Sequence, residues 1–259
     1  MNRKYLFRNN YKGVCDMEGE RLSGHLAFKT QDVSWLDASS PVVVLVSVNS
    51  AFHEKGEGFL KMEAFLATIK RYVRGEVVIL IADTAHLYAQ HLLEGSSAKE
   101  NCLRAGKELV FRYRSLFAGS TLLYWHSLSQ DEAYAEIRSH ILTLFHCDAT
   151  FRNYLFEDAE SAFTEKRKCE FPDKAQFIES TLADLIEQCI FLQILARKQF
   201  RYLFYPGASC KATEYLRTIL SSDLKWIDVF LTIEKKTKIP HLVEIYGGSC
   251  KTRFEAEMR

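Results

Sequence analysis

Largely apolar segments alternate along this chain with stretches in which apolar residues recur at helical spacing. The segments 42–48 and 77–82, together with the shorter segments 120–125 and 201–205, predict strands. Apolar residues at every third or fourth position predict helices over 59–73, 85–93, 98–117, 132–145, 149–167 and 174–198. Because strands alternate with helices, the pattern predicts an α/β fold with a mostly parallel sheet covered by helices.

The two ends of the chain follow less regular patterns. Residues 1–40 are mixed and polar, and we interpret them as a lead-in segment with one short strand near 25–29. Towards the other end, the pattern predicts a helix over 213–220 and strands over 226–233 and 241–246. With 4 Pro, 12 Gly and no low-complexity stretch or linker, residues 1–259 are expected to form a single catalytic domain without internal repeats.

Composition removes several classes of protein. Lys and Arg number 34 against 33 Asp and Glu, so RNA binding would require a local cluster of basic residues. The seven Cys include no CxxC pair, which argues against a disulfide framework or a structural zinc site and favours a reducing cytoplasmic location. The longest apolar run, 41–46, is far too short to span a membrane, and no signal peptide is evident.

Sequence motifs for nucleotide cofactors are incomplete. The segment 247–252, GGSCKT, lacks the Gly that precedes Lys in a phosphate-binding loop and has little chain after it to build a helix. Gly56 and Gly58 follow the first strand, but Lys61 occupies the third glycine position of a dinucleotide fingerprint. No metal-ligand spacing is found either, so we expect neither a cofactor nor a metal.

Ser47 is the first candidate catalytic residue. It lies at the carboxyl end of the first buried strand, where parallel sheets bind their ligands, and it shares a strand face with Val43 and Leu45. Its hydroxyl is therefore expected at the lip of an apolar pocket. A serine at a strand end also commonly acts only as a hydrogen-bonding residue.

Glu187 and Tyr205 are the other two candidate catalytic residues. Glu187 lies on an otherwise apolar line of its helix with Ala183 and Ile190, where burial would raise its pKa and make it a useful base near neutral pH. The alternative is a carboxylate at the edge of the apolar stripe that reaches solvent. Tyr205 ends a strand and either points its phenol into the same crevice or packs beside the Pro206 turn.

The order of these features along the chain resembles the tRNA-dependent cyclodipeptide synthases. The residues that carry the resemblance lie between about 42 and 207, and they are Ser47 with Asn49-Ser50-x-Phe52, Asp83-Thr84, Gly95-x-Ser97-Ala98-x-Glu100, Phe145-x-x-Asp148-Ala149-x-Phe151, the lone inward Glu187, and Tyr205-Pro206. The last pair is similar to the subgroup with a Tyr-Pro signature. The resemblance implies a single Rossmann-like domain similar to class I aminoacyl-tRNA synthetase catalytic domains.

The family's activity would join two amino acids from aminoacyl-tRNAs into a cyclic dipeptide by a ping-pong mechanism. By that resemblance Ser47 is the nucleophile that carries first an aminoacyl and then a dipeptidyl ester, Glu187 binds and deprotonates the incoming amino group, and Tyr205 assists proton transfer. The ester is already activated, so the activity needs no ATP. The implied substrate pocket consists of Val43, Leu45, Ser50, Leu80, Ile190, Leu203 and Pro206.

Two positions depart from the family pattern. A Tyr usually precedes the catalytic Glu by four residues, but Ala183 stands there, so one hydrogen bond to the bound aminoacyl group is missing or comes from elsewhere. A Gly often stands two residues before the Ser, but this chain has Leu45, from which we hypothesise a small first amino acid such as Ala or Gly.

The partners implied are aminoacyl-tRNAs, without DNA or a membrane, and we expect a monomer. Family members hold tRNA phosphates with basic residues on one helix, and the corresponding residues here are Lys99, Arg104, Lys107, Arg112 and Arg114. Such charges also occur on ordinary solvated helix faces. Two alternative functions stay open: a serine hydrolase or acyltransferase that uses Ser47 with His53, and a non-catalytic module that binds tRNA or nucleotide.

Overall fold

The computed structural model describes residues 20–28, 41–48, 58–204, 209–220, 226–237 and 251–252. Several predictions made above fall on other residues: the strand over 241–246, the segment 247–252 apart from its last two residues, and Ser50, His53, Tyr205 and Pro206 all lie outside the described part of the chain.

The described strands join one seven-stranded sheet in the order β1-β6-β5-β2-β3-β4, with β7 paired to β6. The strands β6, β5, β2, β3 and β4 run parallel, while β1 and β7 are antiparallel to β6. Their bounds are Glu20–Phe28 (β1), Val42–Ser47 (β2), Val77–Ala82 (β3), Thr121–Tyr124 (β4), Arg201–Phe204 (β5), Trp226–Thr237 (β6) and Lys251–Thr252 (β7).

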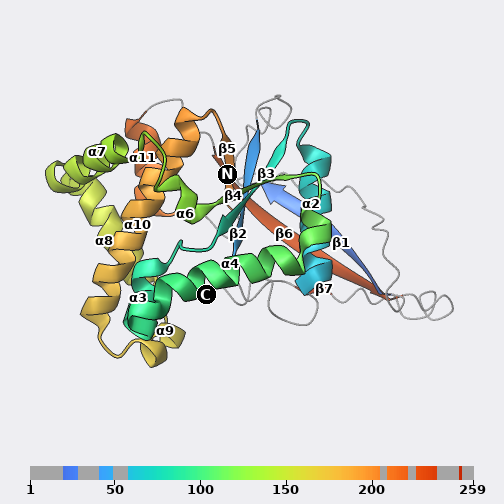
Figure 1. Ribbon diagram of the computed structural model, residues 1–259, viewed down its shortest axis with the longest axis horizontal. Coiled ribbons are helices and arrows are strands. Elements are labelled where there is room, and N and C mark those ends of the chain that lie inside the picture. Colours follow the sequence, from blue (N-terminus) through green and yellow to red (C-terminus); the bar gives the residue numbers. More distant parts are fainter. Residues whose placement is uncertain are drawn as a thin grey trace.

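Helices follow most of the strands. Their bounds are Gly58–Tyr72 (α2), Leu87–Glu94 (α3), Gly95–Ser97 (the 3₁₀ helix η2), Ala98–Arg112 (α4), Arg114–Phe117 (α5), Trp125–Leu128 (α6), Tyr134–Cys147 (α7), Ala149–Ser161 (α8), Glu165–Glu170 (α9), Lys174–Arg197 (α10) and Lys211–Ile219 (α11). In Figure 1 the strands β2, β3, β4 and β5 lie between α2 and the group formed by α7, α8, α10 and α11. The predicted α/β architecture with a mostly parallel sheet is confirmed.

Two predicted helices are each divided in the structure. The segment 98–117 forms α4 and α5, which meet at Tyr113, and the segment 149–167 forms α8 and the beginning of α9. Apolar spacing did not reveal the first break because Tyr113 is itself buried in the core and so continues the apolar stripe. Helix beginnings were easier to predict: the side chains of Asp148 and Asp173 each accept two backbone N–H groups at the start of α8 and α10.

Strand alternation divides the core into two layers, one on each side of the sheet. Val42, Val44 and Val46 of β2 face α2 and the C-terminal half of α4. Val43 and Leu45 face the other side, where they pack in the layer that contains α10. The α10 layer continues through contacts of α10 with α3, α7 and α8.

Among the helices of the described ranges, none is long and apolar enough to cross a membrane.

Candidate active site

Ser47 occupies the last position of β2, beside Ala82 at the end of β3. Val43 is fully buried, whereas Leu45 and Ser47 are only half-buried, so exposure increases along this face towards the carboxyl end of the strand. Ser47 therefore lies at an accessible sheet edge, on the face that Val43 and Leu45 direct towards the α10 layer. This is the placement that the strand pattern predicted.

Glu187 of α10 is held by a residue that the sequence did not single out. The Tyr134 hydroxyl, at the start of α7, donates a hydrogen bond of 2.7 Å to Glu187 Oε1. Burial raises the pKa of the half-buried Glu187 carboxyl, while the Tyr134 hydrogen bond and the Arg138 charge act in the opposite direction. Burial and the neighbouring Glu187 raise the pKa of Tyr134, so its phenol stays protonated and remains a donor.

Tyr134 thus holds this carboxylate from a different helix, α7. Its ring packs against Phe191 of α10, with a centroid separation of 6.1 Å. Tyr134 and Glu187 are 53 residues apart, so no local sequence pattern connects them. Only the packing of α7 on α10 brings the two side chains together.

A second acidic residue, Asp184, precedes Glu187 by three residues on α10. It is 6% exposed and accepts the backbone N–H groups of Tyr88 at 3.0 Å and Ala89 at 3.1 Å, both at the start of α3. Burial raises the pKa of Asp184 to about 7, although the two backbone hydrogen bonds oppose the shift. Asp184 therefore joins α3 to α10 directly beside Glu187.

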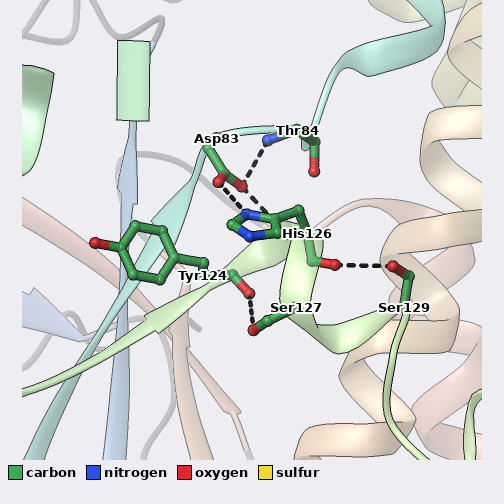
Figure 2. A network of polar contacts seen from close by, with 6 residues as sticks. All are labelled: Asp83, Thr84, Tyr124, His126, Ser127 and Ser129. Atoms are coloured by element: carbon green, nitrogen blue, oxygen red, sulfur yellow. Dashed lines mark hydrogen bonds and ion pairs between the residues drawn. The ribbon is translucent and has the colours of Figure 1, made fainter. Parts of the chain in front are cut away.

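Asp83 and His126 form a polar pair where β3 and β4 end (Figure 2). Asp83 directly follows β3, and its Oδ1 accepts the backbone N–H groups of Thr84 at 2.9 Å and His126 at 3.1 Å. Its Oδ2 contacts Nδ1 of the His126 ring, whose side chain is 36% exposed. Sequence analysis noted Asp83 only as part of a motif and did not identify His126.

Gly106 of α4 allows the close approach that this pair requires. A Cβ atom added at Gly106 would lie 2.7 Å from Asp83 Cβ, which is closer than two carbon atoms can pack. The side chain of Asp83 is 1% exposed, so it has little room to move away. The glycine therefore lets α4 pack directly on the carboxylate that contacts His126.

The predicted substrate-pocket residues do not all lie on one side of the sheet. Val43, Leu80 and Ile190 belong to the α10 layer, but they are fully buried and so support the site from beneath. The prediction that Leu203 lines this pocket is wrong, because Leu203 packs in the layer that faces α2. The reason is its register, since Leu203 pairs with Val44 of the neighbouring parallel strand and points to the same side of the sheet.

All five cations proposed to bind RNA are exposed on α4 and α5. Arg104 and Lys107 flank the buried Gly106 in sequence and face solvent, and Arg104 also donates to Asn101 Oδ1 at 2.6 Å. Phe111 is 70% exposed, with the Arg114 guanidinium 4.6 Å from its ring centroid. Glu100 and Glu108 of α4 are exposed as well, so the helix presents cations interspersed with carboxylates, and an exposed aromatic ring lies near its end.

Searches with the sequence alone found nothing: no protein-family model matches the chain, and no curated protein matches it. Among the residues that the structure describes, no three His, Cys, Asp or Glu side chains are grouped so that they could hold a metal ion.

Solved structures do match. A cyclodipeptide synthase from Fluoribacter dumoffii aligns with a TM-score of 0.69 at 17% identity, covering 83% of this chain and 99% of the other. One from Staphylococcus haemolyticus gives 0.60 at 12% identity, covering 81% and 99%. A Mycobacterium tuberculosis protein, reported to demonstrate that these enzymes are related to type I tRNA synthetases, gives 0.56 at 15% identity, covering 84% and 94%. At such low identity the similarity establishes a shared fold.

Proposed function

We propose that the chain is a cyclodipeptide synthase that takes both amino acids from aminoacyl-tRNAs. The observation that carries the proposal is the position of Ser47 at the carboxyl edge of the sheet, on the face that packs against the helix bearing Glu187. The fold shared with solved cyclodipeptide synthases supports the same conclusion. A serine nucleophile and a carboxylate with a raised pKa are the two groups that the reaction needs.

In the proposed first step, Ser47 Oγ forms a bond to the carbonyl carbon of the aminoacyl ester. The bond from that carbon to the ribose oxygen breaks, and the proton lost by the serine balances the proton gained by the ribose hydroxyl. In the second step the amino group of the aminoacyl-Ser47 attacks the ester carbonyl carbon of another aminoacyl-tRNA. The bond from that carbon to the ribose oxygen breaks, the ribose hydroxyl gains the proton that the amine loses, and a dipeptidyl ester stays on Ser47. Attack by the free amine of that dipeptide closes the ring and returns the proton to Ser47.

Glu187 is the proposed binder and proton acceptor for the amino groups. Because burial raises its pKa, a proton taken from an ammonium group is held more readily than by an exposed carboxylate. Tyr134 fixes one carboxylate oxygen through the 2.7 Å hydrogen bond, which leaves the other oxygen to contact the substrate. On the basis of the resemblance, we also propose that Tyr205 transfers protons in the later steps. The proposal that the chain belongs to the Tyr-Pro subgroup rests on the same resemblance.

The decisive experiment is an intact-mass measurement after the protein is mixed with aminoacyl-tRNA. The wild-type chain should gain the mass of one aminoacyl group, and Ser47→Ala should not. The matched control is Ser129→Ala, which removes an exposed hydroxyl that donates a hydrogen bond to the His126 carbonyl oxygen. Retention of the adduct in Ser47→Ala, or its absence from the wild type under all charged tRNAs, would refute the proposal.

The small molecules released in the same reaction mixtures, identified by mass spectrometry, separate the synthase from a hydrolase. A hydrolase would release free amino acid without any cyclic product, whereas the synthase should release a cyclic dipeptide when two aminoacyl-tRNAs are supplied. Individually charged tRNAs test the hypothesis that Leu45 restricts the first pocket. Alanyl- or glycyl-tRNA should acylate Ser47 fastest, and Leu45→Gly should increase the rate with a bulky amino acid; rapid acylation of the wild type by an aromatic one contradicts the hypothesis.

A further inference from the structure

The pair formed by Asp83 and His126 is not used by the chemistry described above, yet it lies at the same edge of the sheet as Ser47. Ser47 is the register partner of Ala82, and Asp83 is the next residue along β3. Tyr124 is the register partner of Ile81, which places His126 level with Asp83 one strand further away. Because neighbouring strands are about 4.8 Å apart, the backbones of β2 and β4 are about 10 Å apart, a span over which both side chains can contact one substrate.

The layers on the two sides of the sheet show which part of a substrate would pass this point. The residues proposed to hold the amino acid, Ser47 and Glu187, belong to the α10 side. The cations proposed to bind phosphates lie on α4 and α5, and the C-terminal half of α4 and the short helix α5 pack in the layer on the opposite side. A substrate that reaches both must cross the carboxyl edge of the sheet, and the group between an aminoacyl ester and the nearest phosphate is the terminal ribose.

The contacts of His126 determine which atom it offers. Both oxygens of Asp83 act as acceptors in this network, so the Nδ1 atom that contacts Oδ2 carries the ring proton (Figure 2). In the neutral tautomer Nε2 is therefore an acceptor. Among the residues within the described ranges, none hydrogen-bonds to Nε2, and the side chain is 36% exposed.

Two further features hold the imidazole in this orientation. The Tyr124 ring packs at 5.5 Å from the His126 ring, measured between centroids. Gly106 allows α4 to pack directly against Asp83, so the carboxylate itself is confined. A histidine that served only for solubility would not require a buried carboxylate partner, nor a glycine that makes room for that carboxylate.

We propose that His126, positioned by Asp83, accepts a hydrogen bond from the ribose 2′-hydroxyl of the terminal nucleoside of the aminoacyl-tRNA. This inference rests on the proposed function and adds a ribose-binding residue to it. The ester is attached to the neighbouring ribose oxygen, so the hydrogen bond would orient the carbonyl carbon towards Ser47. Asp83 acts as the positioning residue, since it keeps the proton on Nδ1 and leaves Nε2 as the acceptor.

The test is a cycle of two perturbations, one on the protein and one on the substrate. The rate of Ser47 acylation is measured by intact mass in a single turnover, for the wild type and His126→Ala, with aminoacyl-tRNA ending in adenosine or in 2′-deoxyadenosine. With the ribose substrate, we expect His126→Ala to be acylated about tenfold more slowly than the wild type, as for the loss of one hydrogen bond. With the deoxyribose substrate, the variant and the wild type should be acylated at nearly the same rate. His126→Gln, which keeps an acceptor near the same position, should recover part of the loss.

Other outcomes have distinct meanings. Equal losses by His126→Ala on both substrates, or no loss on either, would overturn the ribose contact while leaving the synthase proposal intact. A wild type that is acylated by neither substrate would sink the synthase proposal itself. An activated aminoacyl ester without a nucleoside is the control for folding: His126→Ala should be acylated by it as fast as the wild type, and a matching tenfold loss there contradicts the inference.

Discussion

Asp184 allows a quantitative test of how burial controls the carboxylates of this site. Its pKa is raised from 3.8 to about 7, chiefly by burial. A group whose pKa is higher in the folded than in the unfolded chain favours folding when it is protonated, and this advantage is lost as the pH rises between the two values. The difference between 3.8 and about 7 corresponds to about 4 kcal/mol of destabilisation once the pH exceeds both.

Asp184→Asn replaces the ionisable group with a neutral one of similar shape. In the unfolded chain, the Asp184 carboxyl is mostly ionised by about pH 5. Between about pH 5 and pH 8.5, we therefore expect the free energy of unfolding of the variant to rise by about 3 kcal/mol relative to that of the wild type. Urea denaturation followed by circular dichroism at several pH values measures this difference.

The matched control for this series is Asp131→Asn. The hydrogen bond from Lys198 is the largest cause that lowers the pKa of Asp131, so both folded and unfolded forms are ionised across the range and the difference should stay flat. If the Asp184→Asn difference is also flat, or if the variant loses stability at high pH, then the hydrogen bonds from Tyr88 and Ala89 outweigh burial and the reasoning is wrong.

Three further perturbations test other contacts of the site. Tyr134→Phe removes the hydrogen bond that lowers the pKa of Glu187, so the acid limb of the pH–rate profile should move to higher pH, with a stability loss of about 1–3 kcal/mol in urea denaturation. Gly106→Ala should gain about 1 kcal/mol of helix propensity but lose about 1–3 kcal/mol to the contact with Asp83, so its thermal midpoint should not rise and its acylation rate should fall. Arg104→Ala should weaken binding of tRNA and lower the slope of log K against log salt by about 1, as measured by filter binding.

Much of the architecture could be predicted because burial leaves a period in the sequence. The apolar run of β3 has no polar residue, and its predicted bounds, 77–82, are those observed. Ser47 could be identified for the same reason, since alternation along β2 assigns it to one face and its place at the strand end assigns it to one edge. The helices predicted to begin at 149 and 174 do begin there, where the side chains of Asp148 and Asp173 satisfy backbone N–H groups only two and three residues away.

The remaining features depend on which segments pack together, and periodicity contains no information about that. Leu203 could not be assigned to a face without the register between β5 and β2. The hydrogen bond from Tyr134 to Glu187 left no mark in the sequence pattern, because only the packing of α7 on α10 brings the hydroxyl to 2.7 Å from the carboxylate. His126 gains its partner from the next strand, 43 residues away, through a close approach that Gly106 permits.

The sequence by itself therefore determined the parallel strands β2, β3, β4 and β5, most of the helices and the position of Ser47 at a strand end, since each depends on burial or hydrogen bonding within a few residues. Tertiary structure alone decided which groups surround that residue. A side chain's hydrogen-bonding partner and its pKa depend on atoms brought close by packing, and those atoms come from segments about 40 to 100 residues away in this protein.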